Sequence, residues 1–280
     1  MTSVSIEDIK VDREKAVKRT LDLVNVKSPT GEEGEVAHVY GEMLRALGMR
    51  VTYQEVEPGR YNVVGVLKGK GGGASLMFNG HLDTSFSPTD DPEVLRAISP
   101  VYRFEPPWGY REGDWIYGMG AFNMKGALAA YVTAVEAILD AGVELKGDIM
   151  IAGVVGEIEK SQVDNYRGPQ YRGYGYGTAY LVTHGGLTDF AILGEPTGLR
   201  LMLAHFGSVW AKISLKGTLV HTAHAGLEGN LILQMYKIVK AIEEWVPDYQ
   251  ARFQYMGVKP NVNIGAIEGG WPWRCSRTPW

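Results

Sequence analysis

The sequence has almost no cysteine and no long apolar segment, and these two absences exclude several classes of protein. Cys275 is the single cysteine among 280 residues, so the chain has no intrachain disulfide and no cluster of thiolate metal ligands. No apolar run reaches the roughly 20 residues that a membrane-spanning helix needs. The first residues are strongly charged and lack the apolar core of a signal peptide. We therefore expect a cytoplasmic location.

Basic residues are not in excess either. Lys and Arg number 28 against 32 Asp and Glu, which gives a formal net charge of −4. Binding to nucleic acid or to an anionic membrane usually requires a basic surface, so we expect neither as a partner. The apolar content is that of an ordinary globular protein, and the length suits one large domain or two smaller ones.

The hydrophobic pattern predicts helices and strands that together make an α/β fold. Residues 7–26 carry apolar side chains at helical spacing. Thr30 and Glu33 form a capping box, which predicts the start of a second helix that Gly48 ends. Further helices are expected at residues 124–141 and 178–184. Strands are expected at residues 51–56, 61–67, 74–78, 149–155 and 190–193.

Two connecting segments have distinctive compositions. Residues 69–73 read Gly-Lys-Gly-Gly-Gly. They lack the Gly-Lys-Ser/Thr ending of a phosphate-binding loop, so we expect a hairpin turn that joins two strands. Residues 84–113 are rich in proline and aromatic residues and show no periodicity, which predicts a long packed loop.

Three of the expected strands end in a glycine that is followed by a side chain able to bind a metal. These side chains are His81, Glu157 and Glu195. Ligand sites in open α/β sheets form at the carboxyl ends of strands, so we expect the three to lie together. On extended backbone Asp83 would lie behind His81, accept a proton from one ring nitrogen and leave the other free. A simple His–Asp hydrogen bond in a buried turn is the alternative for that pair alone, but the repeated strand endings favour a metal-dependent site.

A second unit begins near Leu199. Residues 208–215 alternate as in a strand, residues 228–246 have the pattern of a helix, and residues 261–267 are again strand-like. Strand–helix–strand is half of a ferredoxin-like unit. We therefore expect two domains, residues 1–198 and 199–280, of which the second is incomplete, and we expect the chain to be a fragment of a longer protein.

Five motifs, taken in order, resemble those of the metal-dependent exopeptidase and deacylase family that includes acetylornithine deacetylase, succinyl-diaminopimelate desuccinylase, aminoacylase and carnosinase. Each motif is weakly specific alone, but their order and spacing fit from about residue 7 to the end of the chain. The matching stretches are residues 80–84, 117–120 with 123–126, 156–157, 194–197, and 216–217 leading to His221.

This resemblance implies a fold and an activity. It implies that residues 1–198 form a catalytic α/β/α sandwich with a mixed, mostly parallel sheet, and that residues 199–280 form part of a ferredoxin-like lid and dimerisation domain. The activity implied is hydrolysis of an amide bond in a peptide or an N-acyl amino acid. The cofactor implied is zinc, with cobalt or manganese as alternatives, and the assembly implied is a homodimer formed through the lid.

The resemblance also implies roles for single residues. By position, His81 and Glu195 would bind the first metal, and Asn123 stands where the family has an Asp that bridges two metals. Asp83 would orient His81, and Glu157 would be the general base that takes a proton from the attacking water. His221 on the lid would reach across the dimer and polarise the substrate carbonyl.

Three departures from the family pattern fall mainly on the second metal. Asn123 is a neutral amide, which is a poor ligand between two dications. Ile158 replaces a metal-binding Glu, and Glu159, one residue further, would point the other way on extended backbone. The family's last His ligand lies in a part that these residues do not include. We therefore expect one zinc rather than two.

A non-catalytic relative that binds a small ligand or a partner is the alternative function. Asn123, Ile158 and the short chain support it. Glu157 and His221 favour the hydrolase, because a binding module has no need of a general base. Metal analysis beside a panel of amide substrates would separate the two.

Overall fold

The computed structural model describes residues 5–98, 105, 107–158, 173–203, 205, 207–218 and 220–269. The chain divides into two compact units, Met1–Met202 and Leu203–Trp280. This division falls four residues beyond the boundary expected after residue 198. Cys275 and Glu159, and most of residues 99–106, lie outside the described residues.

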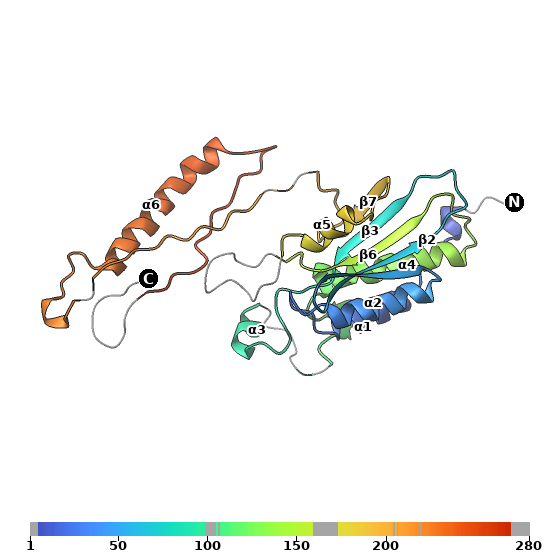
Figure 1. Cartoon of the computed structure of the whole chain (residues 1–280), viewed down its shortest axis with the longest axis horizontal. Helices are drawn as coiled ribbons and strands as arrows, with labels where there is room; N and C mark the ends of the chain where they lie inside the picture. The colour runs from blue at the N-terminus through green and yellow to red at the C-terminus, as the bar shows by residue number, and fades with distance from the viewer. Residues whose placement is uncertain are drawn as a thin grey trace. The chain divides into compact units, whose positions relative to one another are not determined.

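A five-stranded sheet forms the centre of the first unit (Figure 1). β2 pairs antiparallel with β1 and with β6, whereas β6, β3 and β7 are parallel neighbours, so β2 alone runs against the other four strands. The expected mixed, mostly parallel sheet is therefore confirmed. The strands, in spatial order, are β1 (Arg50–Glu57), β2 (Arg60–Leu67), β6 (Ile149–Val154), β3 (Leu76–His81) and β7 (Phe190–Leu193).

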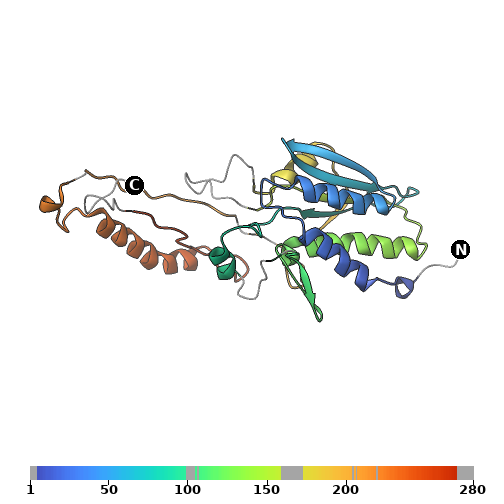
Figure 2. The same ribbon diagram turned by 90° about the horizontal axis from the view of Figure 1, so that it is seen from below.

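Helices cover both faces of this sheet. α1 (Arg13–Val24), α2 (Gly34–Ala46) and α4 (Gly126–Asp140) lie on one side, and α5 (Tyr176–Thr183) lies on the other (Figure 2). Successive residues of a strand point to opposite faces. Val63 of β2 accordingly belongs to the larger core under α2 and α4, while its neighbour Val64 belongs to a smaller core that includes Leu181 of α5. The expected α/β/α sandwich is present.

The segment at residues 84–113 is more structured than expected. It contains the short helix α3 (Pro92–Ile98), and its last residues begin a hairpin of β4 (Tyr110–Glu112) and β5 (Trp115–Tyr117). The helix expected at residues 7–26 is likewise divided into a 3-10 turn, Ile6–Asp8, and α1, whose N-cap is Asp12.

Two local predictions were wrong, and tertiary contacts explain both. Glu33 is the N-cap of α2 but makes no capping bond with its side chain; it pairs with Arg60, and the Thr30 hydroxyl donates to Asp83. Both side chains are buried, where charged partners outweigh a local backbone amide. Residues 69–73 are not a hairpin turn, because β6 lies between β2 and β3.

The second unit is built on the long helix α6 (Leu231–Arg252), whose N-cap Asn230 accepts hydrogen bonds from Ile232 and Leu233. The strands predicted at residues 208–215 and 261–267 are absent from its described part. A strand exists only where the backbone pairs with a neighbour, and neither segment has such a ladder among the described residues. The expected ferredoxin-like half is therefore not formed there.

In the described part of the chain, every helix falls short of the length and apolarity that crossing a lipid bilayer would demand.

Candidate metal centre

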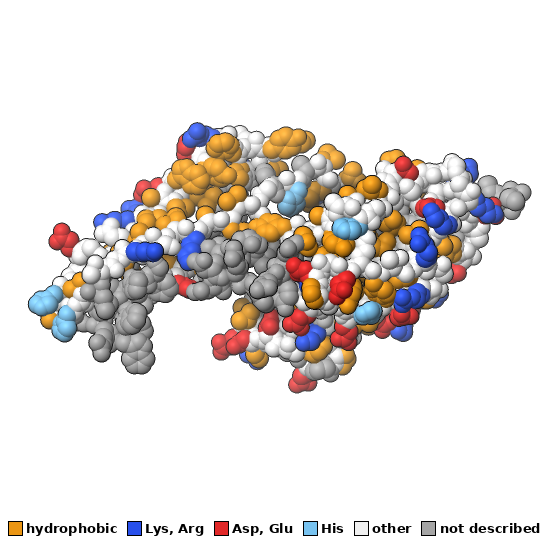
Figure 3. Space-filling view, viewed as in Figure 1, with side chains coloured by type: hydrophobic (Ala, Val, Ile, Leu, Met, Phe, Trp, Pro, Cys, Tyr) orange, Lys and Arg blue, Asp and Glu red, His pale blue; other side chains and the backbone are white. Residues whose placement is uncertain are grey.

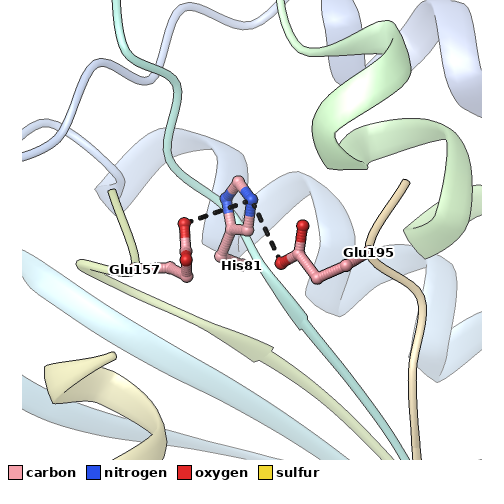
Figure 4. A group of neighbouring side chains, drawn as sticks. All are labelled: His81, Glu157 and Glu195. Atoms are coloured by element: carbon pink, nitrogen blue, oxygen red, sulfur yellow. Dashed lines mark ion pairs between the residues drawn. The ribbon is translucent and has the colours of Figure 1, made fainter. Parts of the chain in front are cut away.

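The carboxyl ends of three parallel strands meet at one edge of the sheet. β3 lies between β6 and β7 and ends at His81, while Glu157 and Glu195 follow the two flanking strands. Figure 4 shows the two carboxylates on either side of the His81 ring, both directed at it. Glu157 Oε2 lies 3.6 Å from His81 Nε2, and Glu195 Oε1 lies 3.7 Å from the same atom. The structure thus brings together the three residues that the strand endings pointed to.

Asn123 completes this group from another direction. It belongs to the irregular turn Ala121–Lys125 that leads into α4. Its Oδ1 lies 2.8 Å from His81 Nε2. Three side chains from three other segments of the chain therefore converge on one ring nitrogen of His81, and each presents an oxygen to it.

The other ring nitrogen of His81 is held from behind. Nδ1 lies 2.9 Å from the backbone carbonyl oxygen of Asp83 and 3.5 Å from its Oδ1. A carbonyl oxygen only accepts, so Nδ1 carries the proton and Nε2 is the nitrogen presented to the oxygen cluster. Asp83 does stand behind the ring as expected, but its backbone carbonyl makes the closer contact.

The Asp83 carboxylate has other partners, which explains this arrangement. It accepts hydrogen bonds from the Thr30 hydroxyl at 2.8 Å, from the Glu157 amide at 3.1 Å and from the Ile158 amide at 3.0 Å. Burial raises the pKa of Asp83, but the hydrogen bonds from His81, Thr30 and Glu157 outweigh that cost and hold the pKa below its ordinary value. Asp83 is thus a buried anion that ties the end of β3 to the loop of Glu157.

The surroundings of His81 favour positive charge on its ring. Burial lowers the pKa of His81, but contact with Asp83, the hydrogen bond to Asn123 and the charge of Glu157 together raise the pKa to about 9. The ring itself is almost completely buried, while Glu157 and Glu195 are partly exposed. A positive charge placed among these oxygens is therefore stabilised by the fold.

The donor set fits a divalent metal ion. His81, Glu157 and Glu195 each offer one ligand atom, and these atoms lie within 4.8 Å of one another. Imidazole nitrogen and carboxylate oxygen are ordinary zinc ligands, and ligand atoms around a tetrahedral zinc with bonds near 2.1 Å are about 3.4 Å apart. The distances at His81 Nε2 are close to that separation. Glu157 and Glu195 lie at nearly the same distance from Nε2.

His221, the remaining residue expected at the site, belongs to the second unit. It is exposed there, just before the 3-10 turn Thr222–His224. The Ala223 amide donates to its Nδ1 at 3.1 Å. The proton of the neutral ring therefore lies on Nε2, which makes Nε2 a hydrogen-bond donor.

Sequence reasoning missed the buried polar residues that hold the loop after β6. Glu33, Arg60 and Asn62 are all completely or almost completely buried. The missed signal lies in β2, where Arg60 and Asn62 stand two residues apart at the start of a strand that is otherwise apolar. Two polar side chains on one face of such a strand indicate a buried polar contact.

Comparison with known proteins places this arrangement in a family. Residues 77–276 match the sequence profile of Peptidase family M20/M25/M40. The chain is 27% identical over 277 residues to N-formyl-4-amino-5-aminomethyl-2-methylpyrimidine deformylase of Bacillus subtilis (strain 168), with 92% of this chain and 59% of the relative covered. It is 31% identical over 176 residues to succinyl-diaminopimelate desuccinylase of Methylocella silvestris, with 61% of this chain and 41% of the relative covered.

Among solved structures, human carnosine dipeptidase 1 aligns with a TM-score of 0.48 and 17% identity, over 65% of this chain and 38% of that protein. The chain spans about half the length of the curated relatives it matches. The family profile covers well over half of the chain and includes both His81 and Glu195. The chain therefore belongs to Peptidase family M20/M25/M40.

Proposed function

We propose that this chain carries the metal centre of a hydrolase that cleaves an amide bond in a peptide or an N-acyl amino acid. The observation that carries the proposal is the convergence of Glu157 and Glu195 on His81 Nε2 at the carboxyl edge of a parallel sheet. The names of the relatives, a deformylase and a desuccinylase, support removal of an acyl group as the reaction class.

The proposed roles follow from the geometry around His81. His81, Glu195 and Asn123 would hold a divalent cation, which when bound supplies a positive charge that acidifies water and polarises a carbonyl. Glu157 takes the proton from the attacking water, because it is the more exposed of the two carboxylates and faces the same point. Asp83 fixes the His81 ring and the Glu157 backbone at once, so the base and the ligand keep a constant separation.

Zinc is the proposed metal, with cobalt or manganese as alternatives, and one ion per chain is the proposed content. The mixed nitrogen and carboxylate donor set supports zinc. Asn123 and Ile158 support a single ion, because neither supplies a charged oxygen for a second one.

The second unit is proposed to mediate a homodimer and to supply His221 to the active site of the other copy. Its helix α6 has no buried residue, and hydrophobic side chains gather over that helix in Figure 3. His221 presents a donor Nε2, which is the property needed to hold a substrate carbonyl. Light scattering of the purified chain tests the dimer.

A cytoplasmic location is proposed on the sequence composition alone.

A hydrolysis panel with controlled metal content tests the proposed function. N-acetyl, N-succinyl and N-formyl amino compounds and dipeptides are incubated with the chain before and after chelator treatment, and again after addition of zinc. We expect hydrolysis that disappears with the chelator and returns with the metal. Metal binding without hydrolysis of any substrate would instead favour the non-catalytic ligand-binding alternative, which the neutral Asn123 and Ile158 support.

A further inference from the structure

Four consecutive backbone amides after β6 each donate to a buried side chain. The Val155 amide donates to Asn62 Oδ1 at 3.0 Å, and the Gly156 amide donates to Glu33 Oε1 at 3.2 Å. The next two amides, of Glu157 and Ile158, donate to the two oxygens of Asp83. Loop amides usually bond to water or to neighbouring backbone, so a complete set of side-chain acceptors fixes the path of this segment.

Glu33 is the member of this set that comes from farthest away in the chain, and Arg60 holds it in place. Arg60 Nε donates to Glu33 Oε2 at 2.8 Å, and Arg60 Nη2 donates to Glu33 Oε1 at 2.6 Å. Arg60 Nη1 also donates to Glu57 Oε2 at 2.5 Å. Glu33 and Arg60 are 0% and 1% exposed. The bidentate geometry leaves one orientation of the Glu33 carboxylate, and that orientation directs Oε1 at the Gly156 amide.

Stability alone does not account for this ion pair. Moving two charges out of water costs as much as their attraction returns, and apolar residues of similar volume often serve equally well. The pair does, however, lie next to the loop that carries Glu157. Gly156 has a φ of +64°, in the left-handed region that favours glycine, and the turn there sends the Glu157 side chain toward His81.

We propose that Glu33, held by Arg60, is a positioning residue for Glu157. Its carboxylate anchors the Gly156 amide from one side while Asp83 anchors the Glu157 amide from the other, and together they set the direction of the Glu157 carboxylate relative to His81. This inference rests on the proposed function in taking Glu157 as the general base. The anchoring itself consists of hydrogen bonds to backbone amides, and these can be measured without an activity assay.

Two double variants of the full chain isolate the anchor. Glu33→Leu/Arg60→Met removes the acceptor for the Gly156 amide together with the guanidinium that pairs with it. Glu33→Gln/Arg60→Met also removes both charges but keeps an amide oxygen at the same place. Glu57→Gln is the matched control, because it removes a carboxylate that pairs with Arg60 and leaves Glu33 in place.

Amide hydrogen exchange is the first readout, with circular dichroism to check the fold. In Glu33→Leu/Arg60→Met we expect exchange at Gly156 to rise roughly fivefold or more, as the loss of one hydrogen bond predicts. Exchange at Val155, which Asn62 holds, should stay unchanged. Glu33→Gln/Arg60→Met and Glu57→Gln should both retain protection at Gly156. Unchanged exchange at Gly156 in the Leu/Met variant, or equal loss in the Gln/Met variant, would overturn the proposal.

The second readout is hydrolysis. We expect kcat of the Leu/Met variant to fall roughly tenfold to a hundredfold with KM little changed, because a displaced base slows the chemical step, and we expect the Gln/Met variant to recover most of it. A normal kcat despite lost protection would also overturn the positioning role. If the wild-type chain hydrolyses no compound in the panel, the proposed function is wrong, and so is the role of Glu33 in positioning a general base. The exchange data would still decide whether Glu33 anchors the loop.

Discussion

The two ring nitrogens of His81 have opposite environments, and this difference gives the site its chemistry. Nδ1 donates to the Asp83 carbonyl in the interior, whereas Nε2 faces Asn123, Glu157 and Glu195. A histidine held in this way directs Nε2 at one point, because the hydrogen bond at Nδ1 fixes the orientation of the ring. The two carboxylates are partly exposed, whereas the ring between them is buried.

The role of Glu157 is testable at the level of a single oxygen atom. Glu157→Gln keeps the size of the side chain and its backbone bond to Asp83 but removes the basic carboxylate. We expect amide hydrolysis to fall by roughly a hundredfold or more, with metal content unchanged. Glu144→Gln, on the surface, is the matched control. Near-normal hydrolysis by the Glu157 variant would show that another group moves the proton.

The proposed metal content follows from the neutral side chain of Asn123. Elemental analysis of protein purified without chelator should give about one equivalent of zinc or less, since a neutral amide and Ile158 leave a second ion short of charged ligands. Asn123→Asp adds a carboxylate at the atom now 2.8 Å from His81 Nε2, and calorimetric titration should show only a modest gain in second-site affinity. Two tightly held equivalents in the wild-type chain would contradict this expectation.

At the scale of elements, α1 and α4 are joined by a small network of charges. Glu136 of α4 accepts from Arg19 at 2.9 Å and pairs with Lys15 at 3.1 Å, both on α1. The Arg19 hydrogen bond is the main reason that the pKa of Glu136 lies below its ordinary value; burial opposes it, and Lys15 adds to the lowering. The two helices thereby keep a fixed register on one face of the sheet.

This network predicts a pH dependence of stability. A carboxylate whose pKa is lower in the folded state stabilises the fold above its unfolded pKa of roughly 4.3, and the contribution is lost as the pH falls through the folded value. Glu136→Gln should therefore lower the melting temperature at pH 7, and the difference from the wild-type chain should shrink as the pH is lowered toward 3. Thermal unfolding of both proteins across this range measures it, with Glu144→Gln as an exposed control. An equal difference at both pH values would exclude an electrostatic origin.

At the scale of the whole molecule, one edge of the sheet in the first unit is exposed. β7 is the edge strand beside β3, and all four of its residues are exposed (Figure 1). Phe190, Ile192 and Leu193 are 65%, 48% and 60% exposed. An edge strand with exposed apolar side chains pairs readily with another chain.

Concentration-dependent association through β7 is the expected consequence. Ile192→Lys places a charge on this edge and leaves the proposed metal ligands unchanged, so it should reduce light scattering at high protein concentration without changing zinc content. Val182→Lys, on the exposed side of α5, is the matched control for adding a charge elsewhere. Equal aggregation of the wild-type chain and the Ile192 variant would show that another surface is responsible.

The sequence by itself determined much of the first unit and the centre of its site. A strand buried on both faces reads as a continuous apolar run, so β6 could be located to within a residue or two. β7 was located from the same apolar pattern, although its residues are exposed in the structure. Gly followed by His or Glu at three strand ends pointed to His81, Glu157 and Glu195, because parallel strands end at one edge. These features depend on neighbours in the chain, which a sequence shows directly.

Only the tertiary structure decided which polar groups share a buried environment. Thr30 and Glu33 have the spacing of a capping box, yet their partners are Asp83 and Arg60, which lie 53 and 27 residues away. The strands predicted in the second unit depend on partners that local alternation cannot supply, and they are absent from its described residues. Periodicity predicts which side chains of a segment are buried. The partner of a buried charge or of a strand edge lies on a distant segment, so only the folded structure identifies it.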